Sequence, residues 1–377
     1  MAGADGLARW DGEAGEQALP YVSARSRSAP ARAVAADDRL TADEAFGLAS
    51  QGTALVWQGD YHNARQLLQA LGRRLDKRRT KLPPVEQPGA RFNAVRMQQA
   101  QRARVLGLLL VPVADDAVPL RRAPDVRAAL SEALTDRPTQ FVLPLRDLLA
   151  FISAHEWRKN GVPIRALAGQ KTHPHFGVFP PTRQDYIDLV GRAPLPAGDV
   201  AFDLGTGSGV LGAVLLHRGV PRLVATDAAP AALTCAAENF ERLGFADRVT
   251  TVGATLWPEG KANLVVCNPP WLPAKAGTSL ESAVYDPESA MLRGFLGGLR
   301  EHLLPGGEGW LVMSDLAEHL GLRRQGELTE MFAAAGLAAL GRLEAAPSPK
   351  GARDNADPFF FARSREVVSL WRLGTST

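Results

Sequence analysis

The sequence has few of the residues that would define a disulfide-bonded, metal-binding or membrane protein. Only two of its 377 residues are cysteines, Cys235 and Cys267, and each lies in an apolar segment that favours a reduced core thiol. His173 and His175 have no cysteine or carboxylate at ligand spacing, so we expect no bound metal. The longest nearly unbroken apolar run, Val105 to Val113, is too short to span a bilayer, and the N-terminus has no apolar signal core. We therefore expect a cytoplasmic protein with no membrane partner.

The chain also has little excess of one charge over the other, but its basic residues are unevenly distributed. The net charge is only +3. From Arg65 to Arg104, however, arginine and lysine far outnumber the acids Asp76 and Glu86. Such a stretch is typical of a surface that binds nucleic-acid phosphates by releasing counterions. A solvated helix face accounts for the same composition, so the stretch alone does not decide between the two.

The length of the chain predicts two domains, because 377 residues exceed one ordinary core, and 46% hydrophobic residues can fill both. Residues 1–38 are rich in alanine, glycine, serine and arginine without a sustained apolar period, which predicts a disordered arm. Residues 39–165 are expected to form a smaller α+β or α/β domain. In it, Thr41 and Glu44 have the spacing of a helix capping box, and strand-like and helical runs follow. We assign substrate recognition to this domain.

From residue 199 onward, short β-rich runs alternate with helical runs. We expect strands at 200–204, 222–226, 248–253, 262–267, 310–314, 337–345 and 366–373, and helices at 209–218, 230–243, from about 287 and at about 324–335. Strands that alternate with helices form right-handed βαβ units, so we expect residues 166–377 to be one domain built on a parallel sheet. Ligands bind such sheets at the carboxyl ends of the strands.

The first of these strands ends in a loop of alternating glycines: Asp203, Leu204, Gly205, Thr206, Gly207, Ser208 and Gly209. Such glycines let the backbone turn sharply and let a ligand approach closely. Val210 stands where a dinucleotide fingerprint would have its third glycine, and Asp203 would repel a pyrophosphate but attract a cationic ligand. Asp227 closes the second strand at a suitable distance for the hydroxyls of a ribose. The loop therefore suits a nucleoside that carries positive charge instead of phosphates.

The fourth strand runs directly into Asn268, Pro269, Pro270 and Trp271. Asn-Pro is a common way to leave a strand, so the tetrapeptide taken alone could be no more than a turn.

Together, these features resemble a known family. Residues from about 176 to 345 resemble the class I S-adenosylmethionine-dependent methyltransferases, on the strength of the sequence DLGTGSG and the acid Asp227. The sequence NPPW resembles the motif of those members that methylate a nitrogen atom on a planar group: N6 of adenine, N2 of guanine or the side-chain nitrogen of glutamine. HFGVFPPTRQDYIDLV is similar to a segment of the small-domain group, which includes ribosomal RNA guanine and release-factor glutamine methyltransferases. The resemblance implies a Rossmann-like, doubly wound, mostly parallel seven-stranded sheet with a reversed last hairpin, and S-adenosylmethionine as cofactor.

The resemblance also implies roles for individual residues. The Asn268 side-chain oxygen and the Pro269 carbonyl would each accept an N–H of the acceptor group, Pro270 would make the backbone rigid, and Trp271 would stack on the planar group. In-line attack on the methyl then needs orientation but no strong base. The residues that would contact the cofactor are Asp203, Gly205, Thr206, Gly207, Gly209, Asp227, Thr255 and Asn268.

Two departures from the family pattern bear on these roles. Ala254 and Thr255 stand where the family often has an acid that holds adenine, so Thr255 or the neighbouring Leu256 would make that contact. Trp271 is larger than the usual tyrosine or phenylalanine. Arg183, before the first strand, is a candidate substrate-binding residue that could equally be structural.

The sequence leaves three alternatives for the function. The first is an N-methyltransferase that acts on a base in RNA, most simply ribosomal RNA, with residues 65–104 as docking surface. The second is a protein-glutamine methyltransferase, for which the same motif would serve. The third, a non-catalytic S-adenosylmethionine-binding subunit, is disfavoured because Asn268 would have little reason to stand beside an intact cofactor loop. A basic path to Asn268 would favour RNA, whereas an apolar or acidic cleft would favour a peptide loop.

Overall fold

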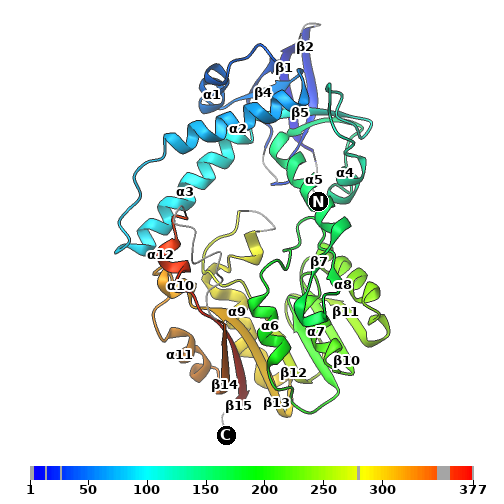
Figure 1. The fold of residues 1–377 in the computed structure, drawn as a ribbon, viewed down its shortest axis with the longest axis vertical. Helices are drawn as coiled ribbons and strands as arrows, with labels where there is room; N and C mark the ends of the chain where they lie inside the picture. Colours follow the sequence, from blue (N-terminus) through cyan, green and yellow to red (C-terminus); the bar gives the residue numbers. More distant parts are fainter. Residues whose placement is uncertain (1–3, 13–14, 26–27, 278–280, 346–356, 376–377) are drawn as a thin grey trace. The chain divides into compact units, whose positions relative to one another are not determined.

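The computed structural model describes residues 4–12, 15–25, 28–277, 281–345 and 357–375 (Figure 1). It divides into two compact units: unit 1 comprises residues 1–83 and 93–156, and unit 2 comprises residues 84–92 and 157–377. We expected the division at residue 165, but Val162 and Ile164 are part of a core of unit 2. Phe92 likewise packs on Tyr285 and Phe359, which places residues 84–92 in unit 2.

Unit 1 contains a mixed sheet of six strands in the order β1-β2-β6-β5-β4-β3. Its strands are β1 (Ala4–Gly12), β2 (Gly15–Val22), β3 (Arg32–Ala36), β4 (Thr53–Trp57), β5 (Leu109–Ala114) and β6 (Gln140–Pro144). The pairs β1–β2 and β5–β6 are antiparallel, and the pairs β2–β6, β3–β4 and β4–β5 are parallel. The smaller α/β domain expected at the N-terminal side therefore exists, with its own sheet.

The expectation of a disordered arm at residues 1–38 is wrong for the described residues, which form β1, β2 and β3. In β1, the buried Ala8 and Trp10 alternate with the exposed Leu7 and Arg9, as in a strand with one face in a core. Their partners in that core include Tyr21 of β2. An alanine and a single tryptophan give a weak apolar period, which explains why the sequence pattern did not reveal the strand.

The helices of unit 1 are α1 (Ala42–Ser50), α2 (Tyr61–Lys77) and α4 (Arg127–Ala133), and α3 (Pro88–Leu106) and α5 (Leu145–Asn160) belong partly to each unit. The capping box is confirmed: Thr41 Oγ1 accepts from Glu44 N at 3.3 Å, and Glu44 Oε2 accepts from Thr41 N at 2.9 Å. The basic residues 65–104 fall mainly on α2 and α3, although the sequence pattern did not reveal α3. None of the helices in the described part of the chain is long and apolar enough to cross a membrane.

Unit 2 contains a sheet of seven strands in the order β11-β10-β9-β12-β13-β15-β14. Its strands are β9 (Val200–Leu204), β10 (Arg222–Asp227), β11 (Val249–Gly253), β12 (Ala262–Cys267), β13 (Leu303–Ser314), β14 (Leu337–Ala345) and β15 (Val368–Thr375). Strands β9 to β13 are parallel, whereas β15 runs antiparallel to both β13 and β14. This confirms the mostly parallel seven-stranded sheet with a reversed last hairpin.

Helices cover both faces of this sheet (Figure 1). One buried core joins the sheet to α6 (Asp185–Arg192), α7 (Val210–His217) and α8 (Pro230–Arg242), and another joins it to α9 (Ala290–His302) and α11 (Glu327–Ala334). The remaining elements are short: α10 (Leu316–His319), α12 (Phe360–Arg363), β7 (Val162–Pro163), β8 (Lys171–Thr172), η1 (Arg165–Leu167), η2 (Ala246–Arg248), η3 (Glu281–Ala283) and η4 (Pro287–Ser289). Strand β9 lies between β10 and β12, so the loops after β9 and β12 leave the sheet side by side.

Candidate functional site

A cavity of about 270 Å³ lies at the carboxyl ends of β9, β10 and β12 in unit 2. All but one of the residues predicted to contact a cofactor line it: Asp203, Gly205, Thr206, Gly207, Asp227, Thr255 and Asn268. Among the described residues of its wall, the only charged ones are Asp203 and Asp227. The described part of the cavity wall therefore presents acids and neutral groups, and no cation, to a ligand.

The glycine loop after β9 brings its backbone to the cavity. Gly205 and Gly207 have φ values of +69° and +54°, a region that side-chain-bearing residues rarely adopt. A Cβ on Gly205 would lie 2.4 Å from Met291 Cε, which itself lines the cavity. Gly209, the exception, does not line the cavity: a Cβ there would lie 3.0 Å from Phe240 Cζ and 3.3 Å from Ala236, both on α8. Because Gly209 has no side chain, α8 can pack closely against the loop.

Asp203 holds the glycine loop in place through buried hydrogen bonds. Its side chain is only 2% exposed, and Oδ2 accepts from Thr206 Oγ1 at 2.7 Å and from Gly212 N at 3.0 Å. Burial raises the pKa of Asp203 to about 6, although these two hydrogen bonds act in the opposite direction. The carboxyl is thus ionised at neutral pH and becomes protonated in mildly acidic solution.

Asp227 fixes the other wall of the cavity at the end of β10. Its Oδ2 accepts from Gly207 N at 3.1 Å and its Oδ1 from Ala229 N at 2.9 Å. The neighbouring Thr226 Oγ1 donates to Leu256 O at 2.7 Å, which holds the loop after β11 against the cavity. Thr255 and Leu256 both line the cavity, and a contact of either residue with adenine stays a prediction.

The segment after β12 places Asn268 and Pro270 in the cavity wall. Trp271 is half-buried beside them, and its Nε1 donates to Asn268 Oδ1 at 2.9 Å. Tyr186 meets the Trp271 ring edge-on, with centroids 6.4 Å apart and planes at 86°. Neither Trp271 nor Arg183 is among the residues that line the cavity.

Arg183 is engaged by two carboxylates. Its Nε donates to Asp185 at 2.7 and 2.9 Å, and its Nη1 donates to Glu366 Oε1 at 2.9 Å. Its Cζ lies 5.0 Å from the centroid of the Trp271 ring. Arg183, the residue predicted to bind substrate, therefore helps to hold the Trp271 ring in place. Its contact with a substrate stays a prediction.

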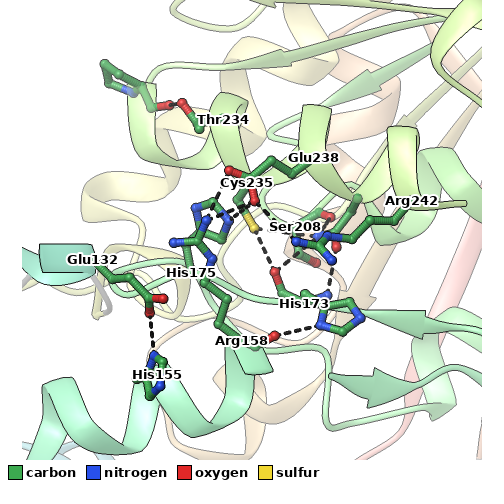
Figure 2. A network of polar contacts seen from close by, with 12 residues as sticks. Glu132, His155, Arg158, His173, His175, Ser208, Thr234, Cys235, Glu238 and Arg242 are labelled. Carbon is green, nitrogen blue, oxygen red and sulfur yellow. Dashed lines mark hydrogen bonds and ion pairs between the residues drawn. The ribbon is translucent and has the colours of Figure 1, made fainter. Parts of the chain in front are cut away.

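The segment between β8 and α6, which includes the family-like sequence HFGVFPP, also forms part of the site, although the sequence analysis assigned no ligand contact to residues 177–179. Gly177, Val178 and Phe179 line the cavity. Figure 2 shows how the residues before them are held: His175 Nε2 lies 3.0 Å from Glu238 Oε2, and Arg158 Nη2 donates to the same carboxylate at 3.0 and 3.1 Å.

A second anchor of this segment is Asn239 on α8. Its Oδ1 accepts from His173 N at 2.7 Å, and its Nδ2 donates to Ser208 O at 2.9 Å. Asn239 thus joins this segment to the glycine loop. In the sequence, this anchor could have been recognised from an asparagine on the apolar face of an amphipathic helix. The two histidines serve here as structural residues, and the described residues contain no group of three or more possible metal-binding side chains.

Comparison with known proteins identifies the family. The family model "Methyltransferase small domain" matches residues 175–339. A release factor glutamine methyltransferase of Cereibacter sphaeroides is 32% identical over 244 residues, which cover 55% of this chain and 87% of that protein. The chain belongs to the S-adenosylmethionine-dependent methyltransferases of this small-domain group. It is therefore an enzyme, and its methyl donor is S-adenosylmethionine.

Other proteins are also similar to parts of the methyltransferase. A release factor glutamine methyltransferase of Moorella thermoacetica is 38% identical over 178 residues, and the match spans 43% of this chain and 62% of that protein. A ribosomal protein L11 methyltransferase of Pelotomaculum thermopropionicum is 45% identical over 84 residues, 22% of this chain and 27% of that protein. A solved S-adenosylmethionine-dependent methyltransferase from Geobacter sulfurreducens in complex with S-adenosylhomocysteine has a TM-score of 0.37 and 17% identity, over 56% of this chain and 96% of that one.

The cavity of the methyltransferase fits its cofactor. The donor carries an electrophilic methyl group on a positively charged sulfonium. Asp203 and Asp227 supply the negative charge that such a ligand needs, and Gly205 and Gly207 leave the wall free of side chains.

Proposed function

We propose that the methyltransferase transfers the methyl group to the side-chain nitrogen of a glutamine in a protein. The observation that carries the proposal is the position of Asn268 and Pro270 in the wall of a cavity whose described charged residues are two acids and no cation. A neutral carboxamide needs hydrogen-bond acceptors and an apolar support, whereas a phosphate-bearing substrate needs cations nearby.

The chemistry of a carboxamide explains why this motif suits it. The nitrogen lone pair is delocalised into the carbonyl, so the group is a weak nucleophile until its N–H bonds are held and oriented. Asn268 Oδ1 and the Pro269 carbonyl are acceptors that can hold those bonds, and the ring of Pro270 keeps the acceptors in place. Orientation then favours in-line attack, and the proton leaves after the methyl has been transferred, so no titratable group is needed in the motif.

The relatives support the same substrate class. Two relatives that match over long stretches, from Cereibacter sphaeroides and Moorella thermoacetica, are both named release factor glutamine methyltransferases. We therefore infer that a translation release factor is the first protein to test as substrate. Substrate recognition would then be the role of unit 1.

RNA remains a second candidate because of one specific feature of unit 1. On α2 and the loop after it, Arg65, Arg73, Lys77 and Lys81 are exposed and have no ion-pair partner among the described residues. These cations favour an anionic partner, most simply ribosomal RNA. The same cations would equally assist docking on a ribosomal complex or an acidic protein, so they carry less weight than the cavity.

The test is methyl transfer from radiolabelled S-adenosylmethionine to a full-length release factor and, in parallel, to total RNA. Asn268→Ala removes the acceptor side chain, and Asn93→Ala changes an exposed asparagine of α3 as a matched control. We expect label in the release factor with wild type and Asn93→Ala, and none with Asn268→Ala. Label confined to RNA would replace the glutamine proposal with the RNA candidate.

A further inference from the structure

The hydrogen bond between Trp271 and Asn268 determines how the asparagine side chain is turned. The indole N–H is a donor only, so the atom that it meets at 2.9 Å must be the amide oxygen of Asn268. The amide NH₂ group then points away from the indole. A carbonyl oxygen has two lone pairs, so one remains for an N–H of the acceptor group.

The indole is itself held by charged and aromatic neighbours. The Arg183 guanidinium lies at 5.0 Å from the ring centroid, and Tyr186 contacts the ring edge-on. Arg183 is fixed by Asp185 and by Glu366, which is only 5% exposed.

This support extends to the end of the central sheet. Ser314 Oγ, at the last residue of β13, donates to Glu366 Oε1 at 2.6 Å. The position of the indole is thus set by groups from three separate parts of unit 2: Arg183 with the start of α6, the end of β13 and the residues before β15.

We propose that Trp271 is a positioning residue for the methyl transfer: its indole N–H fixes the Asn268 oxygen in the direction required by the acceptor nitrogen. The proposal rests on the proposed function, because it assumes that Asn268 holds the acceptor. It differs from a stacking role, since stacking needs only the ring, whereas positioning needs the N–H. Phenylalanine has no such donor, and the hydroxyl of tyrosine lies at the far end of its ring.

The first test compares Trp271→Phe with wild type, using the full chain and a full-length release factor as methyl acceptor. The variant keeps an aromatic ring and loses the donor. We expect kcat to fall about two- to tenfold, the range for loss of one neutral hydrogen bond, with the Kd for S-adenosylmethionine and the melting temperature unchanged. Trp157→Phe, at an exposed tryptophan of α5, should keep wild-type values. A wild-type kcat for Trp271→Phe would overturn the proposal.

The second test needs no acceptor and remains valid if the release factor is not the substrate. The seven tryptophans give seven indole N–H signals in a nitrogen-15 NMR spectrum, and Trp271→Phe identifies the one of interest by its loss. We expect that signal to shift and its hydrogen exchange to accelerate in Asn268→Ala. If it is unaffected by Asn268→Ala, the hydrogen bond is absent and the proposal is wrong. If wild type methylates neither release factor nor RNA while the signal responds, the proposed function fails and the Trp271–Asn268 bond stands.

Discussion

Replacing Asp203 with asparagine tests how the site recognises the charge of its methyl donor. Burial raises the pKa of Asp203 from 3.8 to about 6, so the carboxyl is ionised at pH 8 and mostly protonated at pH 5. S-Adenosylmethionine carries a positive sulfonium, which its product S-adenosylhomocysteine lacks. If the donor binds only the ionised form, its apparent Kd rises by a factor of 1 + 10^(6 − pH), about elevenfold at pH 5 and negligible at pH 8.

The product provides the internal control for this effect. Both ligands contain the same ribose and adenine, so a pH effect on the part of the cavity that binds these groups would change both Kd values alike and cancel in their ratio. The asparagine variant keeps one oxygen that can accept from Thr206 Oγ1 and Gly212 N, so the loop should remain folded. It removes the charge and its titration, so its preference for the donor over the product should be lower at pH 8 and independent of pH.

Isothermal titration calorimetry with both ligands at pH 5, 6, 7 and 8 measures these ratios. In wild type, the preference for S-adenosylmethionine should be full above pH 7 and decline as the pH falls through about 6. A wild-type ratio that does not change with pH would refute the electrostatic role of Asp203. An Asp203→Asn variant with the wild-type pH profile would assign the titration to another group.

Two further predictions concern the packing of unit 2. A Cβ on Gly212 would lie 2.5 Å from Leu223 Cδ2, so Gly212→Ala should lower the free energy of unfolding by about 1–3 kcal/mol in thermal unfolding. Gly297 on α9 has open space around it, so Gly297→Ala should be neutral or stabilising. Equal effects of the two substitutions would contradict this packing. Burial raises the pKa of Cys235 to about 11 and that of Cys267 well above its ordinary value, so neither thiol should react with iodoacetamide at pH 8 until urea is added. Rapid labelling of the native protein would contradict their burial.

The sequence predicted the elements of unit 2 well because its strands are short, and most are continuous apolar runs. Strands β9 and β12 begin and end where the apolar runs do, at 200–204 and 262–267. A parallel sheet buried on both faces produces such runs, and the glycine loop and the NPPW sequence mark where two of them end. The residues that meet in the cavity could therefore be named before the fold was known.

Contacts between distant parts of the chain could not be predicted in this way. Arg183 was a candidate for substrate binding, but its partner Glu366 is 183 residues away and no local pattern connects them. Gly209 was expected to contact the cofactor, yet it packs on α8, because spacing does not tell which side of a loop faces a helix. Strands β1 to β3 were missed because their buried faces are carried by few large apolar residues.

The most direct test of the central claim is the chemical position of the transferred methyl group. S-Adenosylmethionine with a carbon-13 methyl would be incubated with the methyltransferase and a full-length release factor, and the product would be digested and analysed by tandem mass spectrometry. We expect the label on the side-chain nitrogen of one glutamine, and no label when Asn268→Ala replaces wild type. Label on any other residue, or equal labelling by Asn268→Ala, would contradict this claim.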